Sequence, residues 1–128
     1  MNKNITGKTG EDIACKYLID KNYKILFRNH REKSDEIDII AIASDKTLVF
    51  IEVKTMRGPI NSSFGIIPED QLTRDKFRKI SRACLRFSSK HPNLIDDDRG
   101  WRIDLVAITL MGDGEGEGDF EVAHYENI

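Results

Sequence analysis

The sequence has only two cysteines and no long apolar run, and each of these shortages excludes a class of protein. Cys15 and Cys84 lie in helix-like segments without the spacing of a zinc motif, so we expect two unpaired thiols, as in a reducing cytoplasm. A bilayer span needs about 20 consecutive apolar residues, and no stretch comes near that length. Residues 1–12 lack the apolar core of a signal peptide. These shortages predict a cytoplasmic protein without a membrane segment.

Motifs that would indicate other functions are incomplete. Residues 7–9, Gly-Lys-Thr, lack both the upstream glycine and the preceding strand of a phosphate-binding loop. Residues 112–119, GDGEGEGD, resemble a calcium loop, but His124 stands where such a loop needs its bidentate glutamate, and a strand follows. His30 and His91 also lack ligand spacing. We therefore expect no small-molecule cofactor, a hairpin turn at 112–119, and histidines that serve as surface or hydrogen-bonding residues.

The composition predicts one globular domain over residues 1–128. With 39% hydrophobic and 33% charged residues, the chain can form a single core with a charged surface. Hydrophobic periodicity gives the order α-β-β-β-α-β-β, which predicts the α/β class with a mixed central β-sheet flanked by helices. The expected helices are 9–21, with Thr9 as N-cap, and 69–90, and the expected strands are 23–29, 36–43, 47–54, 101–110 and 119–125, with a loop over 55–68.

The hairpin at 36–54 places two acids opposite each other. If residues 44–46 form the turn, Ala43 pairs with Thr47, and counting back along both strands sets Asp38 opposite Glu52. Directly opposed residues have Cβ atoms about 4.5–5.5 Å apart. Two carboxylates on a mostly apolar face repel each other and are costly to desolvate. The pair therefore needs a shared proton, a cationic side chain or a divalent metal.

Carboxylates and backbone carbonyls are hard oxygen ligands, so Mg²⁺ or Mn²⁺ is the metal we expect there. Lys54 follows Glu52 by two residues on the same face, where its ammonium could meet a phosphate or an attacking water. The same register sets Glu36 against Lys54. The hairpin alone therefore leaves two interpretations open, a metal site or a Glu36–Lys54 pair on a solvent-facing hairpin.

Charge is distributed unevenly although the net charge is only −2. Residues 74–90 carry seven basic residues and one acid, and residues 111–128 carry six acids and no Lys or Arg. Such a basic run is either a solvated face or a surface for a polyanion. Lys76 lies at the edge of the apolar helix face, which makes it a candidate site residue. The other cations follow an i, i+4 series: Arg74, Arg78, Arg82, Arg86 and Lys90.

These motifs together resemble the YraN-like family of bacterial candidate endonucleases along nearly the whole chain. That family lies in the PD-(D/E)XK, or restriction-endonuclease-like, superfamily, and a more distant likeness is to archaeal Holliday-junction resolvases. The resemblance rests on Gly10-Glu11, on EIDIIA at 36–41, on LVFIEVKT at 48–55, on Lys76 with Ile80 and Ala83, and on RIDLV at 102–106.

The resemblance implies a restriction-endonuclease-like fold and metal-dependent hydrolysis of phosphodiester bonds in DNA, with branched or structured DNA as one substrate class. It implies that Asp38 and Glu52 hold Mg²⁺ or Mn²⁺, together with the Val53 carbonyl, and that Lys54 is the catalytic lysine. It adds Glu11 as an accessory acid. Phosphate contacts would come from the second long helix, through Lys76, Arg74, Arg78, Arg82 and Arg86.

The roles of three further acids are less direct than those of Asp38 and Glu52. Glu11 is either the accessory acid or an ordinary glutamate in the first turn of its helix. Asp104 lies on a strand, and we assign it a structural role rather than a catalytic one. Asp35 stands where the family often has glycine, so we expect it to add negative charge near the metal.

A rival function is a non-catalytic nucleic-acid-binding module that keeps the fold and uses the basic run. A purely structural partner protein would leave the opposed acids unexplained. Because the chain is net acidic, a homodimer or a partner protein would supply more basic surface for DNA. Divalent-metal binding separates the two leading hypotheses, since the binding module does not need it.

Overall fold

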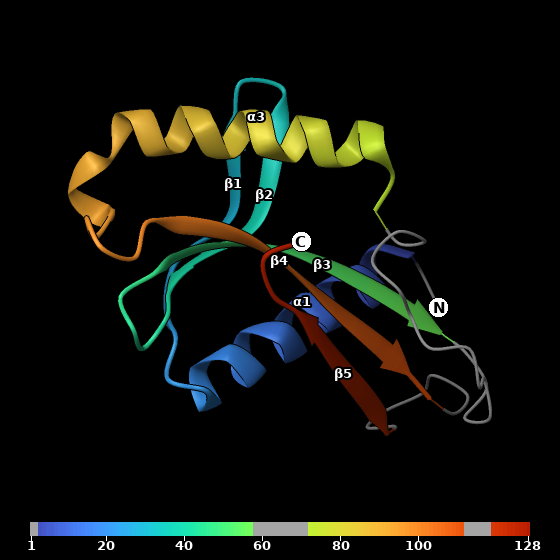
Figure 1. Ribbon diagram of the computed structural model, residues 1–128. Helices are drawn as coiled ribbons and strands as arrows, with labels where there is room; N and C mark the ends of the chain where they lie inside the picture. Colours follow the sequence, from blue (N-terminus) through green and yellow to red (C-terminus); the bar gives the residue numbers. More distant parts are fainter. Residues whose placement is uncertain (1–2, 58–71, 112–118) are drawn as a thin grey trace.

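The computed structural model describes residues 3–57, 72–111 and 119–128, with side chains from Thr9 onward. A five-stranded sheet has one long helix on each face (Figure 1). The predicted order α-β-β-β-α-β-β is confirmed, with a short 3-10 helix before the fourth strand. The elements are α1 (Lys3–Asp20), β1 (Lys24–Glu32), β2 (Asp35–Ile42), β3 (Leu48–Arg57), α3 (Arg74–Lys90), η1 (Pro92–Leu94), β4 (Trp101–Leu110) and β5 (Phe120–Tyr125).

The sheet is mixed, as predicted. Its spatial order is β1-β2-β3-β4-β5. The β3–β4 pair is parallel, and the other three pairs are antiparallel. Parallel neighbours need a long crossover, and here the crossover contains α3. The result is that α3 and α1 lie on opposite faces of the central strands (Figure 1).

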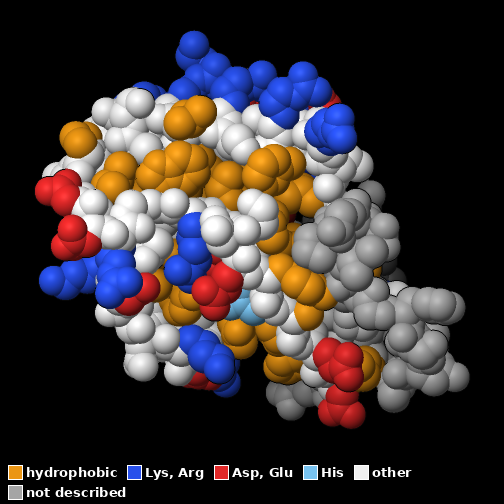
Figure 2. Space-filling model, in the orientation of Figure 1, with side chains coloured by type: hydrophobic (Ala, Val, Ile, Leu, Met, Phe, Trp, Pro, Cys, Tyr) orange, Lys and Arg blue, Asp and Glu red, His pale blue; other side chains and the backbone are white. Residues whose placement is uncertain are grey.

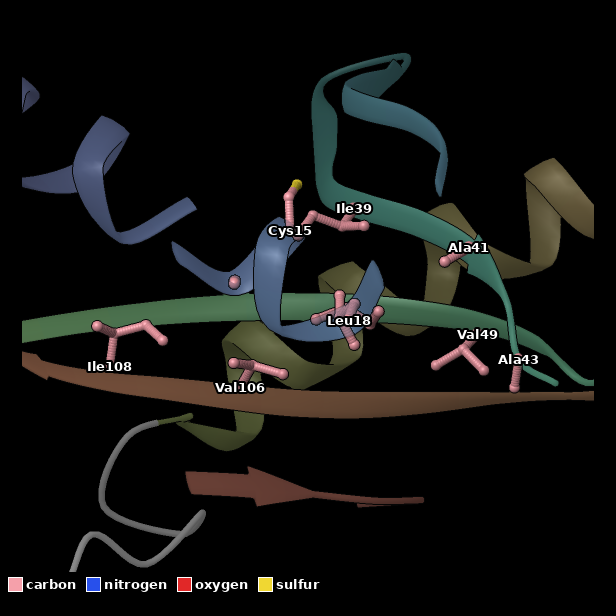
Figure 3. Close-up of a cluster of buried hydrophobic side chains, with 10 residues drawn as sticks. Cys15, Leu18, Ile39, Ala41, Ala43, Val49, Val106 and Ile108 are labelled. Atoms are coloured by element: carbon pink, nitrogen blue, oxygen red, sulfur yellow. The ribbon is translucent and has the colours of Figure 1, made fainter. Parts of the chain in front are cut away.

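Each face of the sheet packs its own apolar cluster because strand side chains alternate. On the α1 face, Cys15 and Leu18 pack against sheet residues such as Ile39 and Val106 (Figure 3). The cluster on the α3 face contains Ile40, Leu48, Phe50, Ile80, Ala83, Cys84, Phe87 and Ile103. Phe87 is fully buried and Trp101 packs against this cluster. Both cysteines are free, as predicted, and buried.

The start of α1 was predicted wrongly. The helix begins at Lys3, so Thr9 lies inside it and does not cap it. The apolar stripe begins only at Ile13, because the earlier contact with the sheet is made by a glycine, which adds no apolar side chain to the periodicity. The other end follows expectation. Asn22 adopts a left-handed φ of 68°, and the Tyr23 N–H donates to the Leu18 carbonyl at 2.9 Å.

The start of α3 was also misplaced. Thr73 is the N-cap, and its side-chain oxygen accepts a hydrogen bond from the Lys76 N–H at 3.2 Å, so the helix begins at Arg74. Residues 69–71 lie outside the described part of the chain. In the expected loop 55–68, the first three residues continue β3 and the rest lie outside the described residues, as does most of the expected turn at 112–119. Within the described ranges, neither long helix is long and apolar enough to cross a membrane.

The β2–β3 hairpin closes as predicted. The Ala43 N–H donates to the Thr47 carbonyl at 2.9 Å, which confirms the turn over residues 44–46. The β1–β2 hairpin is longer than expected and turns tightly at Lys33, whose φ is 55°. Its tip leaves the plane of the sheet and rises to α3 (Figure 1). This departure of β2 from β3 creates the candidate site.

Candidate active site

The two strands that carry the acids pair in the predicted register. Pairing runs from the turn to Ile39 opposite Ile51, and the next position in that register is Asp38 opposite Glu52. The Asp38 and Glu52 side chains are hydrogen-bonded to each other. In antiparallel strands a pair at this position is of the non-hydrogen-bonded type, whose Cα atoms approach to about 4.5 Å. The prediction that the two acids are cross-strand neighbours is therefore confirmed.

Beyond this pair β2 and β3 separate, and a side-chain hydrogen bond takes the place of the backbone hydrogen bonds between the strands. The Val53 N–H donates to Oδ2 of Asp38 at 2.8 Å. The N–H and the C=O of one strand residue point to the same side, so the Val53 carbonyl faces the side on which Asp38 lies. Asp38, Glu52 and the Val53 carbonyl, the three expected ligands, thus come together where β2 leaves β3.

Burial sets the charge of this acid pair. Burial, together with the adjacent Asp38, raises the pKa of Glu52 to about 9, although the Lys76 ammonium acts in the opposite direction. At neutral pH Glu52 is therefore protonated and bonds to Asp38, so two carboxyl groups hold one proton. A divalent cation can convert such a pair into two ligand carboxylates by displacing the proton.

Lys54 lies on the α3 face of β3, with Glu52, and is half-buried. The alternative interpretation required an ion pair between Lys54 and Glu36. Glu36 instead approaches Arg31, its neighbour on β1, at 3.5 Å, and no ion pair joins it to Lys54 in the part of the chain that the structure describes. The surface-pair interpretation is therefore wrong, and the Lys54 ammonium is not taken up by Glu36.

A close helix–strand contact brings Glu11 to the acid pair. Gly10 packs against Thr55 of β3 so tightly that a Cβ at position 10 would collide with the Thr55 side chain. This approach places the next residue, Glu11, where burial and the charge of Asp38 raise its pKa. Since α1 begins at Lys3, Glu11 is not in the first turn, and that alternative is also wrong.

Two residues of β1 that were not predicted as site residues hold Glu11. Asn29 donates a side-chain hydrogen bond to Glu11, and the Arg28 guanidinium lies 3.8 Å from Glu11 Oε1 and 2.8 Å from Asp12 Oδ1. The contact depends on a bulge between Ile25 and Phe27 and on a left-handed φ of 51° at Asn29. An asparagine inside a strand-like run is the only signal that sequence offers for such a bend.

The remaining neighbours of Glu52 come from α3. Lys76 is close enough for its positive charge to oppose the rise in the pKa of Glu52. Cys84 lies beneath the pair, where burial and the nearby Glu52 raise the pKa of its thiol far above the usual range. The described residues contain no cluster of three or more His, Cys, Asp or Glu side chains able to hold a metal. The candidate set is therefore two carboxylates and a backbone carbonyl.

The basic run of α3 is only partly unpaired. Arg82 and Arg86 bind Asp35, and Lys90 binds Glu32 at 2.7 Å. Asp35 therefore faces α3 and its guanidinium groups, which corrects the expectation that it adds charge to the metal site. Arg78 and Lys79 both approach Asp75 of their own helix, while no ion pair of Arg74 or Lys76 is found among the described residues.

Asp104 lies on the other face of the sheet and belongs to a structural network. It pairs in register with Ile51, on the α1 face, whereas Glu52 faces α3. Arg102 donates to Asp104 at 3.0 Å, and His124 lies 2.7 Å from it and bonds in turn to Tyr17. Burial alone would raise the pKa of Asp104, but the hydrogen bonds from His124 and Arg102 hold it below its usual value. These contacts support the structural assignment.

Two solved structures are similar to this chain at low sequence identity. EndoMS in its complex with dsDNA is 15% identical, with a TM-score of 0.45 over 82% of this chain and 38% of its own. A repair endonuclease from Pyrococcus abyssi is 12% identical, with a TM-score of 0.46 over 89% of this chain and 41% of its own. This chain spans about two fifths of each of those longer chains.

Curated relatives are much closer in sequence. A UPF0102 protein of Pelobacter propionicus is 41% identical over 123 residues, which cover 95% of this chain and 80% of the relative. A UPF0102 protein of Alkaliphilus oremlandii is 36% identical over 127 residues, 99% of this chain and 98% of the relative. The model of the family UPF0102 matches residues 10–108 of this chain. The chain therefore belongs to the Uncharacterised protein family UPF0102, the YraN-like family that its motifs resemble.

Proposed function

We propose that this protein is a metal-dependent endonuclease that hydrolyses phosphodiester bonds in DNA. The observation that carries the proposal is the opposed pair Asp38 and Glu52, hydrogen-bonded to each other, with the Val53 carbonyl on the same side. Two half-buried acids in contact need a proton, a cation or a metal to offset their repulsion. Perturbed carboxyl groups of this kind are concentrated at functional sites.

The donor set fits a hard divalent cation. Asp38 and Glu52 offer two carboxylates once the shared proton leaves, and Val53 offers a carbonyl oxygen, a combination suited to Mg²⁺ or Mn²⁺. Such a cation supplies Lewis acidity to a bound water and positive charge to the phosphate in the transition state. The hydrogen bond from the Val53 N–H fixes the Asp38 carboxylate, so at least one ligand is oriented before a cation binds.

Lys54 is the residue that acts on the water and the phosphate. The β3–β4 ladder, in which Lys54 pairs with Ala107, holds its backbone in the rigid centre of the sheet. From that position the ammonium can orient an attacking water and offset negative charge that develops on the phosphate. Glu11, held by Asn29 and Arg28, adds a third carboxyl group at the same edge.

Cleavage of DNA tests the catalytic part of the proposal. Lys54→Ala should lower the cleavage rate at least 100-fold, whereas metal and DNA binding should stay nearly intact, because the lysine acts on the transition state. The assay is a panel of linear, flapped, single-stranded and four-way-junction DNA with Mg²⁺ or Mn²⁺. Lys16→Ala, at an exposed position on α1, is the control and should cut as wild type does. A wild-type chain that cuts no member of the panel contradicts the proposal.

Calorimetry with Mn²⁺ tests the metal part without relying on activity. Asp38→Asn and Glu52→Gln should each weaken binding at least tenfold, since each removes a charged ligand. Glu36→Gln is the matched control, because Glu36 is near the pair but bonds to Arg31. Equal affinity in wild type and both ligand variants would place any metal elsewhere. DNA binding with neither metal binding nor cleavage would support the non-catalytic binding module.

A further inference from the structure

We propose that DNA phosphates bind α3 only along its first two turns, Arg74 to Lys79, and that the cations beyond are committed to ion pairs with buried acids of the β1–β2 hairpin. This inference rests on the proposed function for the identity of the polyanion. It divides a basic run that looks continuous in sequence into two parts with different roles. Figure 2 shows Lys and Arg side chains gathered along the edge of the molecule where α3 lies.

The later part of the run is occupied by acids of the β1–β2 hairpin. Arg82 holds Asp35 with two donors, Nε to Oδ2 at 3.1 Å and Nη2 to Oδ1 at 3.2 Å, and Arg86 adds a third contact at 3.3 Å. The Asp35 side chain is only 7% exposed beneath these guanidinium groups. A two-donor fork of this kind is the geometry with which Arg also binds phosphate, so Asp35 fills the place that a phosphate would take.

Lys90 is occupied in the same way at the next turns of the helix. Its Nζ lies 2.7 Å from Oε1 of Glu32, and the other oxygen of Glu32 lies 2.7 Å from His30 Nε2. Glu32 is 3% exposed, so Lys90 compensates a covered carboxylate. If Lys90 turned to a phosphate, Glu32 would lose this partner, and the exchange would bring little net gain in binding.

The first two turns differ from the later part in net charge and in the exposure of the acid that pairs with them. Residues 74–79 hold Arg74, Lys76, Arg78 and Lys79 against the single acid Asp75, a net charge of +4 − 1 = +3. Asp75 and its two partners are all exposed, and solvent-exposed ion pairs of this kind contribute little and exchange readily. Arg82, Arg86 and Lys90 against Asp35 and Glu32 leave only +3 − 2 = +1.

The first two turns also hold the cation that acts on the acid pair. Lys76 is within electrostatic reach of Glu52, whereas Arg82, Arg86 and Lys90 are bound to acids of the β1–β2 hairpin. A strand that runs across Arg74, Lys76 and Arg78 would therefore bring its phosphates to Asp38 and Glu52. Six residues of helix span roughly 8 Å, so the surface accommodates a short segment of one strand, about two to four phosphates.

The salt dependence of DNA binding tests this division. Fluorescence anisotropy would follow a labelled 20-nucleotide strand and its duplex between 50 and 300 mM KCl in EDTA, so that no cleavage occurs. Arg74→Gln with Arg78→Gln should lower the slope of log affinity against log salt by roughly 1.8 on duplex, at about 0.9 per lost phosphate contact. Arg82→Gln with Arg86→Gln should leave the slope within about 0.5 of wild type. Asp35→Asn should release both guanidinium groups and make binding tighter and the slope steeper.

Equal losses of slope in the two double variants would overturn the proposal, as would Asp35→Asn binding identical to wild type. If the Arg82, Arg86 double variant unfolds, the triple variant that also carries Asp35→Asn removes acid and bases together and gives the same comparison. Failure of the wild-type chain to bind either the single strand or the duplex at 50 mM KCl would also overturn this inference. The proposed metal site would then still be tested independently by Mn²⁺ calorimetry. If the two double variants differ in slope as expected but the wild-type chain cuts no DNA, the DNA-binding surface is supported and the proposed nuclease activity is rejected.

Discussion

A single proton distinguishes the acid pair from an ordinary cluster of surface charges. Burial and the contact with Asp38 keep that proton on Glu52 well above the pH at which glutamate normally releases it. In the unfolded chain Glu52 releases its proton near pH 4.5. Folding therefore takes up a proton at neutral pH, and the folded state becomes less favourable as the pH rises toward about 9.

Glu52→Gln should consequently stabilise the protein at pH 8 and have little effect at pH 4.5. The amide keeps a donor for Asp38 without a proton that must be taken up. The gain should grow by at most about 1.4 kcal/mol for each pH unit above 4.5 at which the folded chain still holds the proton. Urea unfolding in EDTA at pH 4.5, 6 and 8 measures it. Glu36→Gln, at an exposed neighbour, is the control, and a Glu52→Gln effect independent of pH would contradict the shared proton.

At the scale of elements, the site depends on how closely α1 approaches β3. Gly10 is the residue that allows this approach, because any side chain there would meet Thr55. The same contact positions Glu11 near the point where β2 and β3 separate. A glycine within a helix weakens it relative to alanine, so its presence here indicates a packing requirement.

Gly10→Ala should therefore destabilise the protein by about 1–3 kcal/mol, the usual cost of overpacking, although alanine favours helix. Thr55→Gly removes the side chain that the new methyl group meets. In a double-mutant cycle the combined variant should be less destabilised than the sum of the two single variants, with a coupling of at least about 1 kcal/mol. Simple additivity would mean that the two positions do not touch. Denaturant unfolding of the four proteins provides the measurement.

The elements themselves were predictable where their signals are local. The turn at 44–46 and the alternation of the flanking strands gave the register that opposes Asp38 and Glu52, and β4 was predicted with its observed bounds. The starts of both helices were not predictable, since α1 begins six residues before the predicted position 9 and α3 begins five residues after the predicted position 69.

Contacts between segments far apart in the chain are the part of the site that could not be predicted from the sequence. The pairing of Asp35 with Arg82 joins positions 47 residues apart, and nothing in either segment alone identifies the other. Arg28 and Asn29 reach Glu11 only because a bulge and a left-handed residue redirect β1. Such features follow from tertiary packing, which periodicity and spacing do not encode.

At the scale of the whole molecule, Asp104 joins the two ends of the chain. Its carboxylate accepts from Arg102 and from the Asn127 N–H, and bonds to His124, which reaches Tyr17 of α1. The network therefore links the N-terminal helix, two strands and the C-terminal residues at a fully buried position. Removing the charge leaves the buried part of this network without its acceptor.

Asp104→Asn should cost about 3–5 kcal/mol of unfolding free energy, as expected when a buried ion pair loses one partner. The pKa of Asp104 lies below its usual value of 3.8, so its contribution is present above that pH and is lost as the pH falls through the lower folded value. The difference between variant and wild type should accordingly shrink in acid. Glu126→Gln, which also faces Arg102 but is exposed, should cost less than about 1 kcal/mol. Equal costs would contradict the network.

The origin of the acid pair in one hairpin also affects how the chain reaches its native state. Asp38 and Glu52 meet through adjacent strands and a short turn, whereas Lys76 and Glu11 arrive from distant segments. Hairpins form in about 1–10 μs, and contacts close in sequence are made early. The carboxyl groups therefore approach each other before α3 covers them, and proton uptake becomes a step of folding itself. Part of the stabilisation by Glu52→Gln at pH 8 should thus appear in stopped-flow experiments as faster refolding.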